Sequence, residues 1–233
     1  MPSRTVEELQ DTLDASLAWR RIELSALRAE VDRSSRQNSA SPLARVLARS
    51  GVALLYAHWE GFTKDAFVAY VDFLSRRRLR LDQLNDGLLR TVFLSLHQRI
   101  ASGDDAALDH FLKAMRNPSS ARAEIPRRGM VNTRSNLRYR VLSEILESVG
   151  MNTNDFSTKS NLIDHSLCDA RNEIAHGREQ FPSAEEFHAL YQEMMAIMET
   201  VRHRILEEVR TETYKASKFA TGRGYTSTGL AAL

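Results

Sequence analysis

The sequence predicts an all-α fold, an up-down helical bundle with extra helices between its core helices. Apolar residues recur at steps of three, four or seven in several long segments, which is the spacing of one face of an α-helix. No segment shows the alternation of apolar and polar residues that marks a strand. The 233 residues include only 5 prolines and 10 glycines, which favours long helices over many short strands.

The first predicted helix covers residues 5–33 and is amphipathic. Its apolar positions are leucines and valines with charged residues between them, namely Val6, Leu9, Leu13, Leu17, Leu24, Leu27 and Val31. Residues 34–42 are rich in Ser, with Asn and Pro, and are predicted to break the helix. We therefore expect an N-terminal helix and linker over 1–41, a helical domain over 42–213 and a flexible tail over 214–233.

The second predicted helix runs from about 43 to 78, with a bend allowed near Gly51. It carries six aromatic residues on more than one side: Tyr56, Trp59, Phe62, Phe67, Tyr70 and Phe73. A helix that is apolar on several sides is usually the central helix of a bundle. The arginines within 76–80 are interpreted as a helix-end cluster, because cations complement the negative end of the helix dipole.

Shorter helices are predicted over residues 86–101, 105–116 and 136–149, with an irregular segment over 117–135. A further helix over about 159–176 ends at Gly177, which suits the left-handed residue that often follows a helix. Ser183 and Glu186 form a capping box, which predicts that the last long helix begins there and continues to about 213.

Composition excludes several classes of protein. The formal net charge is only +2, so the overall charge does not indicate a nucleic-acid binder. Cys168 is the single cysteine, which excludes an internal disulfide framework and a cysteine zinc cluster and favours a reducing compartment. No run approaches the roughly 18 apolar residues that span a bilayer, and the N-terminus lacks the pattern of a signal peptide. We therefore expect a cytoplasmic protein with no membrane partner.

Residues that could carry chemistry gather in the segment 164–177, DHSLCDARNEIAHG. On a helical wheel, His165, Asp169, Asn172 and His176 form one polar stripe opposite an apolar stripe. Two histidines, an aspartate and an asparagine indicate hydrogen bonding or proton transfer rather than an ordinary solvated face. Asn172 lies four residues before His176, so its amide could orient the imidazole. The helix C-terminus would favour a protonated imidazole at His176.

The run from Arg171 to His176 resembles the R-x(4–6)-H motif of HEPN domains, with a polar residue directly after the arginine. The segment 54–71, LLYAHWEGFTKDAFVAYV, resembles the MAE-type HEPN nucleases of bacterial defence and toxin–antitoxin loci. The resemblance covers roughly residues 40–213 and implies an HEPN-like bundle. It also implies an endoribonuclease that cuts RNA, such as tRNA or mRNA, as a homodimer, with an antitoxin or defence-system protein as a further partner.

The resemblance implies RNA cleavage without a metal or other cofactor. The ribose 2′-OH attacks the adjacent phosphate and leaves a 2′,3′-cyclic phosphate and a 5′-OH. His176 would be the general acid or base, Arg171 would bind the scissile phosphate, and Asn172 would orient His176 or contact the phosphate. On a straight helix Arg171 and His176 lie about 140° apart. Either the helix is distorted near its end, or the cleft takes Arg171 from one protomer and His176 from the other.

Three further residues are predicted to support this site. Glu60 either pairs with Lys64, four residues later, or is a buried carboxylate that holds Arg171 in place. His165 and Asp169 belong to the same polar stripe as His176. His165, Asp169 and His176 could also ligate a divalent ion, but no companion motif elsewhere in the sequence favours a metal site.

Residues 116–140 carry seven arginines against one acid, Glu124. Four of them are predicted to contact RNA phosphates: Arg127, Arg128, Arg134 and Arg138. The whole chain has 27 arginines and 5 lysines, so part of this enrichment reflects general composition.

Two other functions fit the same residues. A non-catalytic HEPN module would use Arg171 and His176 to bind RNA or a partner protein, or to hold structure, without turnover. A plain helical interaction protein would carry the motif by coincidence. Cleavage of RNA in the presence of EDTA separates the nuclease from both alternatives.

Overall fold

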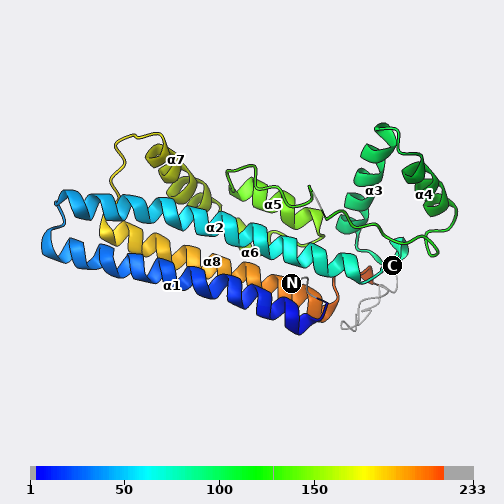
Figure 1. The fold of residues 1–233 in the computed structure, drawn as a ribbon, viewed down its shortest axis with the longest axis horizontal. Helices are drawn as coiled ribbons and strands as arrows, with labels where there is room; N and C mark the ends of the chain where they lie inside the picture. Colours follow the sequence, from blue (N-terminus) through cyan, green and yellow to red (C-terminus); the bar gives the residue numbers. More distant parts are fainter. Residues whose placement is uncertain (1–3, 128, 218–233) are drawn as a thin grey trace, which may run out of the picture.

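A computed structural model of the chain describes residues 4–127 and 129–217 and confirms the all-α fold, since no strand forms within these ranges. Three long helices form the body of the molecule: α1 (Val6–Asn38), α2 (Pro42–Arg76) and α8 (Ala184–Thr211). They lie side by side along the longest axis, and each packs against the other two (Figure 1). α1 is therefore an integral part of the bundle.

The helix α1 begins at Thr5, where a capping box with Glu8 satisfies the first backbone N–H groups. It runs to Asn38, so the prediction of a break over residues 34–38 is wrong. Ser34 is only 4% exposed, because it lies on the face that packs against the core. The actual break falls at Ser39–Ser41, and Ser41 caps the start of α2, with Pro42 in its first turn.

The helix α2 is the central helix, as predicted, and its large aromatic side chains are buried. It also continues without interruption through Gly51, where a bend was expected. A Cβ atom at Gly51 would lie 2.7 Å from Cε2 of Phe187 on α8. The close approach of Phe187 on α8 therefore explains the glycine at this position.

The chain between α2 and the motif segment folds into five shorter elements. They are η1 (Leu81–Gln83), α3 (Asp86–Ala101), α4 (Asp105–Arg116), α5 (Tyr139–Ser148) and α6 (Asn154–Ser157). α3 packs against both α4 and α5. The α3–α4 pair lies at the end of the bundle where α2 finishes, and α5 lies along the upper side of α2 (Figure 1).

The helix predicted over 159–176 is irregular in its first half. Leu162–Asp169 (η2) is a π-helix, and the regular helix α7 follows over Ala170–Ala175. Gly177 has φ +72° and ends α7 in the left-handed conformation, as its position in the sequence predicted. The predicted capping box between Ser183 and Glu186 opens α8.

The beginning of the C-terminal segment is attached to the bundle. Tyr214 is buried, and its carbonyl oxygen accepts a hydrogen bond of 3.0 Å from the backbone N–H of Asn85. The N–H of Ala216 donates to the carbonyl of Gln83 at 2.8 Å. The rest of the predicted flexible tail, residues 218–233, lies outside the described residues, and so does Arg128. In the described ranges, no helix combines the length and the apolar character that crossing a membrane requires.

Candidate functional site

We call the helical segment 162–176, which carries Arg171 and ends at His176, the motif helix. A short loop over residues 133–138 forms hydrogen bonds both with α2 and with this helix. The backbone N–H of Leu137 donates to the hydroxyl of Tyr56 at 2.9 Å, and Trp59 Nε1 donates to the carbonyl of Leu137 at 3.1 Å. The hydroxyl of Thr133 donates to Glu60 Oε1 at 2.6 Å. These bonds are largely shielded from water, so they fix the loop firmly on one face of α2.

The tip of this loop holds an unusual backbone conformation. Arg134 and Ser135 have φ +53° and +54°, in the left-handed region that residues with a Cβ rarely occupy. The turn directs the carbonyl oxygen of Ser135 toward the motif helix, where it accepts a bond of 3.4 Å from Arg171 Nη2. Strain of this kind persists where surrounding contacts fix the chain, as the bonds of Leu137 and Thr133 do here.

The guanidinium of Arg171 is held from three directions. Its central carbon lies 3.9 Å from the centroid of the Tyr56 ring, and Nη1 donates to Asn172 Oδ1 at 2.9 Å. The carbonyl of Ser135 supplies the third contact. Within the described residues, no carboxylate forms an ion pair with Arg171. The side chain is therefore an oriented cation with unsatisfied N–H donors, which is the arrangement that binds a phosphate.

The imidazole of His176 is exposed at the C-terminal end of α7. Its backbone N–H donates to the carbonyl of Asn172 at 3.0 Å, but its ring forms no hydrogen bond with another described residue. The amide of Asn172 contacts Arg171 and not the imidazole. The ring of His176 is therefore accessible to a ligand, and no described residue fixes its tautomer.

The two motif residues do not share a face of one protomer. α7 is regular from Ala170 to Ala175, and the π-helical distortion precedes Arg171 instead of separating it from His176. The angular offset of about 140° expected on a straight helix is therefore retained. Arg171 is directed toward α2 and the 133–138 loop, whereas His176 is directed to solvent.

The first half of the polar stripe is already occupied by contacts within the chain. Asp169 accepts hydrogen bonds from Arg138 and from His165 Nδ1, the latter at 2.8 Å. These bonds, with Arg138 contributing most, lower the pKa of the Asp169 carboxyl below its ordinary value. The Asp164 carboxylate likewise accepts the backbone N–H of Tyr139 at 2.7 Å. Asp169 thus contacts both Arg138 and His165, and within the described part of the chain no hydrogen bond connects His165 or Asp169 to Arg171.

Two buried acidic groups beside the site are held in their neutral forms. Burial raises the pKa of the Cys168 thiol to about 12. Burial also raises the pKa of the Tyr56 hydroxyl well above its ordinary value. Neither group is suited to act as a nucleophile near neutral pH.

Glu60 lies beside the site without touching Arg171. Its carboxylate accepts the bond from Thr133, and no ion pair joins it to Arg171 or to Lys64 among the described residues. Glu60 and Arg171 both act electrostatically on Tyr56, Glu60 raising and Arg171 lowering the pKa of its hydroxyl. Its contact with Arg171 is therefore indirect, through the loop and the Tyr56 ring.

Three of the four arginines predicted to contact RNA lie in the described residues, and these three do not form one surface around Arg171. Arg138 binds Asp169, and Arg134 pairs with Glu144. Arg127 donates to Ser75 Oγ at 2.9 Å near the C-terminal end of α2.

Sequence reasoning missed the residues that hold the motif helix on α2. Besides Tyr56 and Ser135, they include Arg49, whose Nη1 donates to the carbonyl of Gln180 at 3.0 Å. Arg49 Nη2 reaches the carbonyl of Ile174 at 3.4 Å and so satisfies an acceptor at the end of α7. Arg49 and Tyr56 are seven residues apart and lie on one face of α2, a spacing that the sequence could have revealed.

The fold and the Arg171–His176 motif define a helical bundle of the HEPN type. The sequence model of the RiboL-PSP-HEPN family matches residues 15–207, from α1 to α8. The chain therefore belongs to the RiboL-PSP-HEPN family, which confirms the resemblance to HEPN domains. Comparisons with curated proteins and with solved structures found no match.

Proposed function

We propose that the protein is a metal-independent endoribonuclease that acts as a homodimer. The observation that carries this proposal is the guanidinium of Arg171, which is oriented by Tyr56, Asn172 and Ser135 and is paired with no carboxylate in the described ranges. Arg138 in the neighbouring loop, by contrast, is paired with Asp169. A scissile phosphate would supply the missing negative charge.

The reaction is an intramolecular transfer within the RNA. The 2′-oxygen forms a bond to phosphorus and loses its proton to a base, while the bond from phosphorus to the 5′-oxygen breaks. The leaving oxygen takes a proton, which gives a 2′,3′-cyclic phosphate and a 5′-OH. Arg171 stabilises the charge that develops on the phosphate oxygens, and His176 carries one of the protons. The other proton is exchanged with water.

The regular geometry of α7 favours a site shared between protomers. Arg171 and His176 of one chain are directed to different sides, so one phosphate would not meet both of them. Two copies related by a two-fold axis would bring Arg171 of one chain to His176 of the other. This arrangement is one of the two that the sequence left open.

A candidate dimer surface lies next to the motif helix. A shallow apolar groove of about 730 Å³ runs between α1, α2 and α7 and is lined by Leu27, Val46, Arg49, Ser50, Ala53, Leu54, Ala57 and Ile174. Val46 is 57% exposed in the single chain. Because Ile174 is two residues before His176, a second copy seated here would approach the exposed imidazole. A stable dimer would extend this contact to about 1,200–2,000 Å² of buried surface.

The biological setting belongs to the same proposal. We infer a role in a bacterial defence or toxin–antitoxin system, with tRNA or mRNA as substrate and a cognate antitoxin or defence protein as partner. This inference is supported by the sequence of α2 around Trp59 and by membership of an HEPN family.

A non-catalytic RNA- or protein-binding scaffold is the second candidate. The observation that favours it is the lack of an orienting partner for the His176 ring among the described residues. A general base or acid usually has such a partner, which fixes its tautomer. In a scaffold, Arg171 would bind phosphate and His176 would have no part in turnover.

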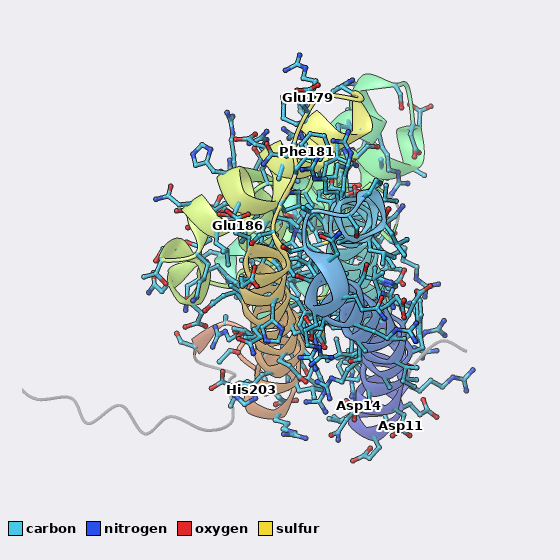
Figure 2. All side chains as sticks on the ribbon, turned by 90° about the vertical axis from the view of Figure 1, so that its left-hand side faces the viewer. Asp11, Asp14, Glu179, Phe181, Glu186 and His203 are labelled. Carbon is cyan, nitrogen blue, oxygen red and sulfur yellow. The ribbon has the colours of Figure 1, made fainter. Side chains whose placement is uncertain are left out.

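The test is cleavage of total tRNA and a structured mRNA in EDTA by the purified wild type and by His176→Ala. His203→Ala is the matched control, because His203 is also exposed but lies on α8, on the lower side of the bundle, far from the loop that carries Glu179 and Phe181 (Figure 2). We expect the wild type and His203→Ala to leave 2′,3′-cyclic phosphate ends and His176→Ala to be inactive. Equal cleavage by all three proteins would refute the assignment, and RNA binding without cleavage would favour the scaffold.

A further inference from the structure

Six arginines gather at the end of the bundle opposite to the motif helix. They line a hollow of about 450 Å³ together with Ser75, and we call this site the arginine hollow: Arg4, Arg76, Arg77, Arg78, Arg122 and Arg127. Three of them, Arg76, Arg77 and Arg78, were interpreted from the sequence as part of a helix-end cluster. The structure adds three arginines from segments distant in sequence.

The fold brings these segments together where α2 ends. Arg78, two residues after the end of α2, has φ +52° in the left-handed region. The following residues run beside a distant segment, since Leu81 N–H donates to the carbonyl of Ala121 and Ala123 N–H donates to that of Leu79. This pairing places Arg122 beside the end of α2. The hydrogen bond from Arg127 to Ser75 attaches the next part of the same segment.

The positive charge of the hollow is only partly compensated. Asp72 is shared, because it accepts two hydrogen bonds from Arg76 and lies 3.6 Å from Arg127 Nε. The Arg77 guanidinium lies 4.1 Å from the Phe73 ring and acts on Glu7 only at longer range. Arg77, Arg78 and Arg122 form no ion pair with another described residue.

The end of a helix does not account for this cluster. The C-terminal dipole of α2 corresponds to roughly half a negative charge, which one cation complements. Several guanidiniums around one hollow repel one another unless an anion lies between them. Arginine side chains are suited to bind phosphate groups, because each presents several N–H donors in a planar fork.

The arginine hollow is separate from the Arg171–His176 site. Tyr56, which contacts Arg171, and Arg77 are 21 positions apart on the same helix and its cap, which corresponds to about 30 Å at ~1.5 Å per residue. Figure 1 shows the same separation, with α7 above the N-terminal half of α2 and the α3–α4 pair at its other end. A single mononucleotide cannot reach both sites, whereas a nucleic acid of roughly 9 stacked nucleotides can, at ~3.4 Å per nucleotide.

We propose that the arginine hollow is a second RNA-binding site, which binds backbone phosphates of the same RNA whose scissile bond lies at Arg171. This proposal rests on the proposed function and extends it to the class of substrate. The protein would favour RNA that is long enough to span both sites over RNA that reaches the motif alone. Phosphate contacts carry no sequence information, so the hollow contributes affinity and register.

The test compares two double variants of the full chain with the wild type. Arg78→Gln/Arg122→Gln removes two unpaired charges of the hollow. Arg21→Gln/Arg33→Gln removes the same charge from α1, where the two side chains are 52% and 66% exposed. Binding is measured by fluorescence anisotropy with 2′-O-methyl RNA, which cannot be cut by attack of a 2′-OH. One probe is a hairpin of about 30 nucleotides and the other is a single strand of about 5 nucleotides. Circular dichroism and thermal unfolding establish that the variants are folded.

We expect Arg78→Gln/Arg122→Gln to weaken binding of the hairpin about tenfold and to reduce the slope of log K against log salt by about 1.5. The affinity of this variant for the short strand should change less than about twofold. The affinities of Arg21→Gln/Arg33→Gln for the hairpin and for the short strand should also change less than about twofold. The proposal of a second site would be overturned by an equal loss of affinity in both double variants, by an equal loss for both RNAs, or by no loss of affinity. Each of these outcomes leaves the proposed function intact if the wild type still cuts RNA. Absence of RNA binding and cleavage by the wild type would instead reject the proposed function itself.

Discussion

The two halves of the segment 162–176 are alike in sequence and different in structure. In η2, polar side chains are paired within the chain: Asp169 binds Arg138 and His165. In α7 and its cap, the Arg171 guanidinium has no carboxylate and the His176 ring has no hydrogen bond among the described residues. A helical wheel places His165 and Asp169 of the first half on one stripe with Asn172 and His176 of the second. The structure separates them into a paired half and an open half.

This difference indicates which polar residues stabilise the fold and which are available to a ligand. Arg138 and Arg171 both lie in the layer above α2, yet Arg138 is compensated by Asp169, and Arg171 is held by a ring, an amide and a carbonyl. An arginine that is oriented but not neutralised can accept an anion without first losing an ion pair. The open half therefore carries the candidate chemistry.

The largest effect on stability is expected in the paired half. Leu167 is fully buried, whereas Ile174 in the open half is only partly buried and borders the apolar groove. Leu167→Ala should lower the free energy of unfolding by about 2–5 kcal/mol, and Ile174→Ala by less. Urea unfolding followed by circular dichroism measures both values. A loss at Ile174 equal to that at Leu167 would show that the two halves are equally part of the core.

Loss of the open-half arginine should have the largest effect on catalysis. Arg171→Ala is expected to lower kcat/KM for RNA cleavage by about 10²–10³, which is typical for removal of one group that stabilises transition-state charge. Arg138→Ala should change kcat/KM by less than about threefold, because it removes a partly exposed ion pair. Initial rates on one RNA, with folding checked for each variant, decide the comparison. A smaller loss for Arg171→Ala than for Arg138→Ala would reverse the assignment of the two halves.

The ring and the hydroxyl of Tyr56 are expected to have separable roles. Tyr56→Phe keeps the ring under Arg171 but leaves the buried N–H of Leu137 without its acceptor. The free energy of unfolding should fall by about 1–3 kcal/mol, with cleavage nearly unchanged below the melting temperature. Tyr56→Leu should lose cleavage as well. If both variants cut equally well, the stacking contact does not position Arg171.

The smallest effect concerns the acid stability of the paired half. The pKa of Asp169 is lowered in the folded state, so its contribution to stability is present above the ordinary aspartate pKa of about 3.9. The contribution is lost as the pH falls through the lowered folded-state value. Because the Asp169 side chain is 44% exposed, Asp169→Asn should cost only on the order of 0.5 kcal/mol at pH 7. The difference from wild type should shrink below about pH 4 in urea unfolding series. A difference that persists at low pH would mean that the pair acts through packing and not through charge.

Much of the fold was predictable because its signals are local. Periodic apolar residues and caps such as Gly177 and the Ser183–Glu186 box depend on neighbours within one or two turns. The prediction of a helix break over 34–38 failed because burial of Ser34 on the core face outweighed the low helix preference of the segment. The π-helical geometry of η2 gave no signal in the sequence.

The candidate site was predictable in its residues but not in its environment. The motif and its spacing identify Arg171 and His176. Whether each is paired depends on residues far away in sequence, such as Tyr56 and Ser135, which are brought together by tertiary structure. The arginine hollow was missed for the same reason, because Arg122 meets the end of α2 only through the pairing of the segments around Leu81 and Ala121.

In the dimer that we propose, one active site takes Arg171 from one protomer and His176 from its partner. The most direct measurement mixes inactive Arg171→Ala and His176→Ala proteins under conditions that exchange subunits, and then assays RNA cleavage in EDTA. A shared site predicts that mixing restores about a quarter of wild-type activity, because about half of the dimers are mixed and each has one intact site of two. If the wild type cuts RNA and the mixture stays as inactive as either variant alone, a shared site is contradicted.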